Sequence, residues 1–508
     1  MNELSERLAG ISQDRLRGIR RGVEKESLRC EPDGMLALTP HPRALGSALT
    51  HPHITTDFSE SQLEMVTGAR EGADATLAEL VEIHQAVFSV LKAQDEMLWV
   101  SSMPCRLPVD ETIPLGRYGG SNVGRAKSIY RMGLSHRYGR RMQTISGIHY
   151  NWSLPGVVNG EYFGLIRNFR RYAFLPLYLF GASPAVCSSF VAEREHRLQP
   201  LGNGNCMHLP YATSLRMGRL GYQSEAQAGL AVSYNCLKSY ADSLEEALTQ
   251  PYAPYEAIGI RGLGGEYNQL TTSLLQIENE FYDTIRVKRV TRPGERPLHA
   301  LRERGVEYVE VRLMDLDPFE PVGISVETMR FLDVMLLYCL LVDSPEDTPQ
   351  EIAELQHNRH LAASRGREPG LRLARGGREV LLVEWAAELL DGMREVALTL
   401  DRALGGSHHA QALARAARGI EQPQTLPSAR VLQEITGVYG NSYPAFVVDH
   451  AAQLRDDILA MPCPDELLAR FGALAVSSQR EQERVEAADT VSFETYRQAY
   501  VAADGLWA

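Results

Sequence analysis

The chain has 508 residues, of which 44% are hydrophobic and 23% are charged, and its formal net charge is −12 at pH 7. This balance is typical of a folded globular protein and excludes a disordered, collagen-like or coiled-coil chain. Because an acidic surface repels phosphodiester backbones and anionic bilayers, we expect neither nucleic acid nor a membrane as a partner.

The N-terminus and the cysteines indicate the cellular compartment. The first ten residues, MNELSERLAG, contain acids and no apolar core, so they do not resemble a secretory signal. The seven Cys include no CxxC pair, which argues against a disulfide framework and against a zinc site. We therefore expect a cytoplasmic protein in a reducing environment, and we expect a monomer.

Apolar residues that recur at intervals of three and four predict several helices. The predicted helices cover 77–97, 226–248 and 326–343, and the pattern after about residue 378 is almost wholly helical. The loop-rich stretches between the patterned segments lie around 104–124, 200–210, 251–269 and 345–378. No internal repeat and no low-complexity linker divides the chain.

Strand periodicity appears in three short segments that contain most of the chemically informative residues. In GVEKESLR, Glu24 and Glu26 share one face of the predicted strand, because side chains at i and i+2 point the same way. In SGIHYNWSLP, His149 and Asn151 share the polar face. In GVEYVEVRLMD, Glu310 shares a face with Arg312. Such one-sided strands predict a polar cavity on one side of a sheet and a core on the other.

Two carboxylates side by side on a strand repel each other unless a positive charge lies between them. Asp and Glu oxygens with one imidazole suit Mg²⁺ or Mn²⁺, hard ions that bind nucleotide phosphates. The segment IRVKRVTR adds basic side chains that could hold phosphoryl oxygens, namely Arg286, Lys288, Arg289 and Arg292. These residues suggest an ATP-type site.

Each of these signals also has a simpler interpretation. A same-face Glu pair on an edge strand is usually solvated, a single His is usually structural, and a basic cluster is about as often a solvated patch as a phosphate site. The chain has no GxxxxGK[ST] motif, and GLGG at 262–265 lacks the strand-then-helix context of a phosphate loop. From the residue pattern alone, a metal–phosphate site remains a hypothesis.

Longer segments resemble the bacterial glutamate–cysteine ligase family of the γ-proteobacterial type. The resemblance covers most of residues 20–345 in the family's order. Its blocks are RGVEKESLR (21–29), HPRALGSALTHPHITTDFSESQLEMVT (41–67), SSMPC (101–105), GRAKSIYRMGLSHRYGRRMQTISGIHYNWSLP (124–155), YLFGASPAVCSSF (178–190), LPYATSLRMGRLGY (209–222), LQIENEFYDTIRVKRVTRPGE (275–295) and GVEYVEVRLMDLDPFEPVGI (305–324).

The resemblance implies an α+β fold, in which a curled, mainly antiparallel sheet forms an active-site funnel similar to that of glutamine synthetase and is surrounded by helices. It implies a catalytic core over 1–345 and a mostly helical C-terminal part over 346–508 packed on it; a single domain, 1–508, is the alternative. It also implies that Glu24, His149 and Glu310 hold Mg²⁺ at the nucleotide phosphates. Metal nearer the reacting carboxylate would be held by Glu26, Asp57 and Glu64.

Further roles follow from the same resemblance. Arg216 and Arg312 would be catalytic cations that stabilise the transferring phosphoryl group and substrate carboxylates. From the basic segment described above, we expect Lys288 and Arg289 to bind ATP phosphates. The residues implied to bind the amino-acid substrates are Phe58, Tyr130, Arg131, Leu134, Gln143, Ile145, Asn151, Tyr222 and Tyr282.

The implied activity is ATP-dependent ligation of the L-glutamate γ-carboxylate to the L-cysteine amine through γ-glutamyl phosphate, which is the first step of glutathione biosynthesis. ATP is then a co-substrate, Mg²⁺ or Mn²⁺ the cofactor, and the partners are small molecules. Two alternatives remain: a γ-glutamyl ligase for another small amino acid, and a catalytically silent relative that only binds ligands.

Overall fold

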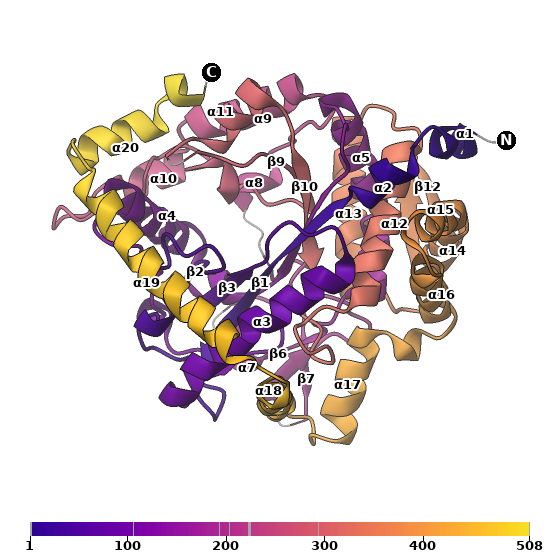
Figure 1. Cartoon of the computed structure of the whole chain (residues 1–508), viewed down its shortest axis with the longest axis horizontal. Helices are drawn as coiled ribbons and strands as arrows, with labels where there is room; N and C mark the ends of the chain where they lie inside the picture. Colours follow the sequence, from indigo (N-terminus) through magenta and orange to yellow (C-terminus); the bar gives the residue numbers. More distant parts are fainter. Residues whose placement is uncertain are drawn as a thin grey trace.

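The computed structural model describes residues 3–104, 106–192, 194–202, 204–221, 225–292 and 294–506. Helices surround a central antiparallel sheet; in Figure 1 the C-terminus lies at the top of the view and the N-terminus at its right. The predicted α+β class, with a mainly antiparallel sheet enclosed by helices, is confirmed. Within the described residues, no helix is both long enough and apolar enough to cross a membrane.

The strands are β1 Arg20–Cys30, β2 Ile54–Thr56, β3 Gln62–Val66, β4 Met97–Leu98, β5 Ile148–Ser153, β6 Ala185–Cys187, β7 Gln199–Leu201, β8 Cys206–His208, β9 Ile285–Lys288, β10 Tyr308–Met314, β11 Arg372–Arg375 and β12 Arg378–Leu381. The helices before the C-terminal part are α1 Glu3–Ala9, α2 Gln13–Arg17, α3 Ala73–Leu91, α4 Asn122–Tyr138, α5 Asn159–Tyr172, α6 Phe174–Phe180, α7 Ser188–Val191, α8 Glu225–Ala228, α9 Leu237–Thr249, α10 Ala253–Ile258, α11 Pro297–Arg304 and α12 Val326–Leu341. The later helices are α13 Pro349–Arg365, α14 Leu382–Gly392, α15 Arg394–Leu404, α16 His408–Glu421, α17 Pro427–Gly437, α18 Tyr443–Ala460, α19 Asp465–Ala487 and α20 Phe493–Val501.

The central sheet has seven strands in the order β2-β3-β1-β5-β10-β9, and the short β4 pairs with the end of β1. All of these pairs are antiparallel, and the strands come from segments almost 300 residues apart in the chain. The three segments with predicted strand periodicity form β1, β5 and β10, which are adjacent in this sheet. The topology therefore gathers the polar faces of all three segments on one surface.

The opposite face of the sheet packs into the main hydrophobic core. Val23, Tyr150, Trp152 and Val309 point to this face and are fully buried. Helix α3 contacts β1, and α5 contacts β9 and β10. Burial of a large apolar side chain contributes about 1.5–3 kcal/mol, and a one-residue slip would turn these side chains out of the core. The apolar face therefore fixes the register that aligns the polar face.

The C-terminal helices pack closely on the rest of the chain. Helix α16 contacts α12, α18 contacts α3 and β4, and α20 contacts α4. In Figure 1, α19 and α20 (yellow) run along the side formed by α4, whereas α14, α15 and α16 lie on the other side beside α12. One continuous hydrophobic cluster includes residues from Leu8 to Leu506. The division at residue 345 into two domains stays a prediction.

Two of the differences from the predicted secondary structure are informative. The loop-rich stretch 345–378 contains the 17-residue helix α13, whose buried residues are few and mostly small, so its apolar period is weak. Its start signal is present in the sequence, because Thr348 caps the helix by accepting from Glu351 N (3.2 Å) and Pro349 follows the cap. The predicted helix 226–248 is interrupted between α8 and α9.

A buried polar network joins β1 to the helices behind the sheet. Arg21 lies on the same core-facing side of β1 as Val23. It forms an ion pair with Asp333 of α12 (Nε–Oδ2 2.7 Å), and both side chains are at most 1% exposed. Tyr150 of β5 donates to the same carboxylate (2.9 Å), and His409 of α16 lies 3.9 Å from it. Burial alone would raise the pKa of Asp333, but Arg21 and His409 hold it below its usual value.

We expect Asp333→Asn to lower the free energy of unfolding by about 3–5 kcal/mol near neutral pH, because it leaves the buried Arg21 without its counter-ion. Since the pKa of Asp333 is lower in the folded state, its contribution is complete above the unfolded value of about 3.9 and is lost as the pH falls through the folded value. Urea denaturation of both proteins at several pH values measures this difference.

The control is Asp14→Asn, which removes an exposed pair with Arg17 and should cost less than about 1 kcal/mol. A wild type and an Asp333→Asn variant of equal stability at pH 7 would contradict the assignment.

Candidate active site

The inner face of the central sheet brings together the predicted metal ligands of four strands. Glu24 lies opposite His149, and Glu26 lies opposite Glu64 in the register of β1 with β5 and β3. Glu310 lies opposite Asn151 on the next strand. Because paired residues in antiparallel strands point to the same face, these side chains all face one cavity.

Glu24, His149 and Glu310 form the tightest group. One ligand atom from each of the three residues lies within 4.8 Å of the other two. His149 Nδ1 is 3.2 Å from Glu24 Oε2 and 3.9 Å from Glu310 Oε1. Burial and Arg312 lower the pKa of His149, so its imidazole is neutral at pH 7 and can donate a lone pair to a metal. Carboxylates with one imidazole suit Mg²⁺ or Mn²⁺, so this donor set fits such an ion.

A second acidic group lies beside the first. Burial raises the pKa of Glu26 to about 8, and the Asp57 carboxylate adds to the shift. Burial and the carboxylates of Glu24 and Asp57 also raise the pKa of Glu64 well above its usual value. Among the described residues, none donates a hydrogen bond to the Glu64 carboxylate. Acids that repel one another in a buried site are best neutralised by a cation.

Glu310 differs from these acids because two cations bind it directly. Lys288 Nζ is 3.0 Å from Glu310 Oε1, and Arg312 Nη1 is 2.8 Å from Oε2. Burial alone would raise the pKa of Glu310, but Lys288 and Arg312 hold it well below its usual value. Glu310 is therefore a carboxylate at neutral pH, and both cations also line the cavity.

Arg216 is a buried cation that lies against Gly147. Its Nη2 donates to Arg312 O (2.8 Å), and its Nη1 is 3.9 Å from Asp315 Oδ1. A β-carbon at position 147 would lie 2.0 Å from Arg216 Nη2, so only glycine leaves room for the guanidinium. The amide of Gly147 donates to Glu26 (2.7 Å) and thereby ties the arginine to the acidic group.

Helix α4 and two loops supply another part of the wall. Tyr130, Arg131 and Leu134 lie on the α4 face that lines the cavity, at the spacing of adjacent turns. Arg131 donates from Nε to the backbone oxygen of Asp57 and stacks over the Tyr118 ring. The other predicted substrate residues that line the cavity are Phe58, Gln143 and Tyr282. The predicted substrate residue Tyr222 lies outside the described residues.

Three predicted site residues do not line the cavity. Ile145 is fully buried, and its carbonyl accepts from Gln62 Nε2 (3.0 Å). Asn151 donates to Glu24 Oε1 (2.9 Å) and thus supports a predicted ligand from the side. Arg289 follows Lys288 and points the other way, because neighbouring strand residues alternate; its Nη1 donates to the Arg304 carbonyl (2.9 Å). Direct substrate contact by these three residues stays a prediction.

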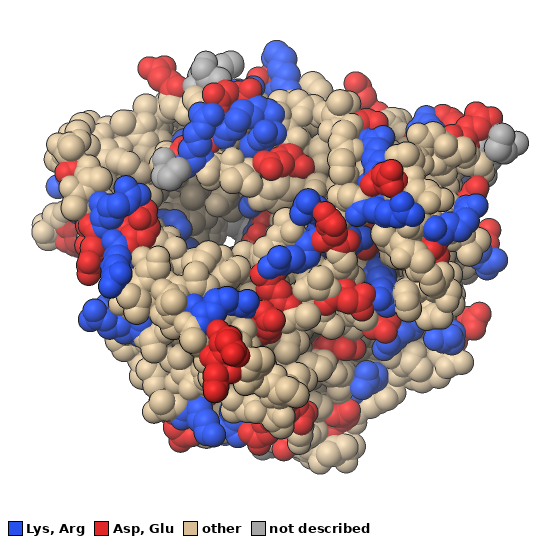
Figure 2. All heavy atoms as spheres, viewed as in Figure 1, with Lys and Arg blue, Asp and Glu red and all other residues tan. Residues whose placement is uncertain are grey.

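The cavity has a volume of about 1,230 Å³. It exceeds the range of about 300–1,000 Å³ that is usual for a pocket with one small ligand. Figure 2 shows this side of the molecule as hollowed, with Lys and Arg side chains gathered at the upper rim. The residues that line the cavity include the exposed Arg292, a member of the predicted basic cluster. The cavity is therefore large enough for more than one small ligand.

The cavity also contains cations that were not among the predicted site residues. Lys127 lies one turn before Tyr130 and Arg131, so the helical spacing of GRAKSIYR could have indicated it. Arg170 of α5 and Arg359 of α13 also line the cavity. Nothing in the local sequence distinguishes these two arginines from surface residues, because only the tertiary fold brings their helices to the cavity.

Comparison with known proteins identifies the family. Residues 7–362 match the glutamate-cysteine ligase family. The glutamate–cysteine ligase of Azotobacter vinelandii is 47% identical, and the match covers 99% of each chain. That of Alcanivorax borkumensis is 45% identical over 96% of each chain. The solved structure of the Francisella tularensis glutamate–cysteine ligase, in complex with AMP, matches with a TM-score of 0.90 and 35% identity, over 95% of this chain and 97% of that one.

A bifunctional glutathione synthetase from Pasteurella multocida shares the fold, with a TM-score of 0.70 at 24% identity, over 93% of this chain and 57% of that one. The expectation drawn from the sequence blocks is confirmed by the family match and by these high-coverage relatives. The chain therefore belongs to the glutamate–cysteine ligase family of enzymes.

Proposed function

We propose that the enzyme joins the γ-carboxylate of L-glutamate to the amine of L-cysteine and converts ATP into ADP and phosphate. The product is γ-glutamylcysteine, and the reaction is the first step of glutathione biosynthesis. The observation that carries this proposal is the convergence of Glu24, His149 and Glu310 in a cation-lined cavity. Because the reaction uses ATP and a free thiol, we propose the cytoplasm as its location.

The acidic groups fit the metal that this reaction requires. Glu24, His149 and Glu310 would hold one Mg²⁺, and Mn²⁺ accepts the same donors. The raised pKa values of Glu26 and Glu64 support a second metal position, which Asp57 would complete. Bound Mg²⁺ would neutralise the charge on the phosphoryl oxygens of ATP.

The cationic side chains would bind and orient the phosphoryl group. Lys288 and Arg312 flank Glu310 and face the cavity, so they can donate to phosphoryl oxygens. An oxygen of the glutamate γ-carboxylate would attack the γ-phosphorus, and the bond from this phosphorus to the bridging oxygen of ADP would break. This step gives γ-glutamyl phosphate, in which phosphate is a leaving group that a free carboxylate lacks.

The second step would form the amide. The cysteine nitrogen attacks the acyl carbon, the carbon–oxygen bond to phosphate breaks, and the nitrogen loses a proton. Tyr130 and Leu134 of α4, together with Phe58, give this side of the cavity an aromatic and apolar wall. Such a wall would exclude water from the acyl phosphate and suits a small side chain that carries a thiol.

The relatives support the choice of substrates. The Azotobacter vinelandii and Alcanivorax borkumensis enzymes are named for glutamate and cysteine, and they match almost the full chain. The Francisella tularensis structure contains AMP, which supports an adenine nucleotide as co-substrate. These relatives favour cysteine over another small amino acid as the acceptor.

Purified enzyme with Mg²⁺, ATP and glutamate should release ADP at a sustained rate only when cysteine is added, because the acyl phosphate is protected until the amine arrives. A coupled assay for ADP, run with each substrate omitted in turn, measures this dependence. Sustained ADP release without cysteine would contradict the proposal. A panel of small amino acids, compared by kcat/KM, should rank cysteine first.

Glu310→Gln should lower kcat/KM by about 10²–10³-fold, the usual loss when one preorganised electrostatic group is removed from an active site. Its fold should be retained, as measured by near-UV circular dichroism. The matched control is Glu307→Gln, because Glu307 precedes the same strand but bonds outward to Val290 N (3.2 Å). Activity of Glu310→Gln close to that of the wild type would rule out the assigned role.

Mg²⁺ should stabilise the wild type against unfolding by about 2.7 kcal/mol at 100 times its Kd. Glu64→Gln should lose much of this gain, because it removes a proposed ligand. Without metal, the variant should be more stable than the wild type by about 0.5–2 kcal/mol, because one repelling acid is gone. Thermal denaturation with Mg²⁺ or EDTA tests both effects. Glu71→Gln, at an exposed ion pair with Arg20, is the control and should respond to Mg²⁺ like the wild type.

A further inference from the structure

Arg359 is a cation of the cavity wall that forms no ion pair with any residue that the structure describes. It belongs to α13, which contributes Ile352, Gln356 and Arg359 to the lining of the cavity. Its Nε is buried and makes no hydrogen bond within the described part of the chain. No carboxylate of the described residues lies within ion-pair distance of its guanidinium. A half-buried guanidinium whose Nε is shielded from water is costly in this state unless a ligand supplies the missing anion.

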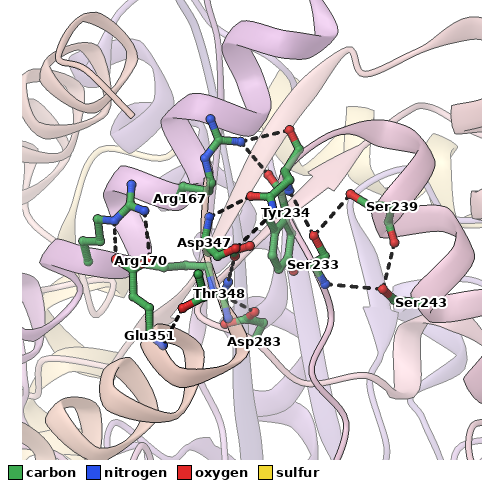
Figure 3. A network of polar contacts seen from close by, with 12 residues as sticks. Arg167, Arg170, Ser233, Tyr234, Ser239, Ser243, Asp283, Asp347, Thr348 and Glu351 are labelled. Carbon is green, nitrogen blue, oxygen red and sulfur yellow. Dashed lines mark hydrogen bonds and ion pairs between the residues drawn. The ribbon is translucent and has the colours of Figure 1, made fainter. Parts of the chain in front are cut away.

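Asp283 is the acid whose charge acts most strongly on the pKa of Arg359, but Asp283 already has other partners. Figure 3 shows Asp283 within a polar network that also contains Arg170 and Asp347. Arg170 Nε is 3.3 Å from Asp283 Oδ2, and its Nη1 is 3.1 Å from Asp347 Oδ2. Thr284 N donates to the other oxygen of Asp283 (2.7 Å). Asp283 is thus held by Arg170 and the backbone, and it is not a dedicated partner of Arg359.

Burial lowers the pKa of Arg359 below its usual value, and the field of Asp283 offsets this effect only in part. An arginine remains charged even so. The positive charge therefore faces the cavity without full compensation from the protein, and an anion that entered beside it would be stabilised.

The neighbours of Arg359 indicate which anion this is. Tyr282, which lines the cavity, also acts on the pKa of Arg359, so the two side chains are close in space. Arg216, by contrast, acts on Glu26 and lies beside the acidic groups, where the reacting end of glutamate must bind. The ligation requires two amino acids, each with an α-carboxylate, and bidentate arginine suits such a group.

We propose that Arg359 binds the α-carboxylate of the acceptor amino acid and thereby selects amino acids over simple amines. This inference rests on the proposed function and adds a substrate-binding residue from α13. Tyr282 lies on one side of the carboxylate, and the amide of Gln356 is available on the same helix. Arg359 positions the acceptor and takes no part in bond making.

A purely structural role makes a different prediction. Asp283 and Asp347 share the cation Arg170, so in a purely structural role Arg359 would serve only to balance the remaining negative charge. Loss of Arg359 would then disturb the Tyr282 segment and lower turnover with every acceptor alike. A substrate-binding role lowers turnover only with acceptors that carry a carboxylate.

The test compares cysteine with cysteamine, which has the same thiol and amine but no carboxylate. In Arg359→Gln, kcat/KM for cysteine should fall by about 10- to 100-fold, the loss expected for a hydrogen bond to a charged group. The value for cysteamine should change less than about threefold. The KM for cysteine should rise while the KM for glutamate and that for ATP stay near their wild-type values.

Arg365→Gln is the matched control, because Arg365 lies on the same helix but forms an exposed pair with Glu368 (2.5 Å). It should behave like the wild type with both acceptors. Arg359→Lys keeps the charge but loses the bidentate fork, so it should recover part of the preference for cysteine. If Arg359→Gln does not fold, the lysine variant is judged by the ratio of kcat/KM for cysteine to kcat/KM for cysteamine. If cysteamine turnover is too slow to measure, the KM values for cysteine, glutamate and ATP decide.

Equal losses with cysteine and cysteamine, or a raised KM for glutamate in place of cysteine, would overturn the role of Arg359. The proposed function is judged separately, on the wild type alone. If the wild type uses another amino acid in place of cysteine, the proposed function fails, and Arg359 is then scored with that amino acid and its decarboxylated amine. A wild type without any amine-dependent ADP release would refute both.

Discussion

Repulsion between carboxylates that the sheet holds on one face is the constraint on which the site depends. Glu24 and Glu26 lie on β1, Glu64 on the neighbouring β3, and Glu310 on β10, which β5 separates from β1. The apolar side chains behind the sheet set the register of these strands. The acids cannot move apart without pulling Val23 or Val309 out of the core. The packing of the opposite face therefore holds the acids close together. Their mutual repulsion gives the cavity its affinity for positive charge.

The acids of the sheet differ in how far neighbouring cations neutralise them. Lys288 and Arg312 stabilise the ionised form of Glu310, whereas Glu26 and Glu64 have raised pKa values. On the opposite face of the sheet, which packs into the core, Arg21 and Asp333 form a buried ion pair. Arg21 and Asp333 neutralise each other within the protein and contribute to stability. The raised pKa values of Glu26 and Glu64 mean that a bound cation would stabilise the ionised forms of these two acids. If ion pairs within the protein neutralised all of these acids, the cavity would be more stable but would not attract a cation.

The sequence was most informative where period and chemistry coincide. Alternation in GVEKESLR, SGIHYNWSLP and GVEYVEVRLMD predicted both the strands and the face that carries Glu24, His149 and Glu310. Which strands are neighbours could not be read from alternation; the family resemblance implied only that the ligands converge on one face of a curled antiparallel sheet, and the order of the strands comes from the structure. Arg289 was predicted to bind phosphate because it lies in a basic cluster, yet the same two-residue period turns it away from Lys288. Helix α13 was missed because small buried residues give little periodic signal, and Arg359 was missed with it.

The position of α13 has a consequence for how this enzyme can be divided. The helix follows the last strand of the central sheet and lies beyond residue 345, yet it supplies part of the wall around the reaction space. The match to the family also ends within this helix, at residue 362. The cavity wall therefore includes residues beyond the sheet. In a shortened chain that ends after α12, the cavity would be open to solvent on the side that α13 lines. A protein that contained the sheet alone would keep the proposed metal ligands but would lack the wall that α13 adds to the cavity.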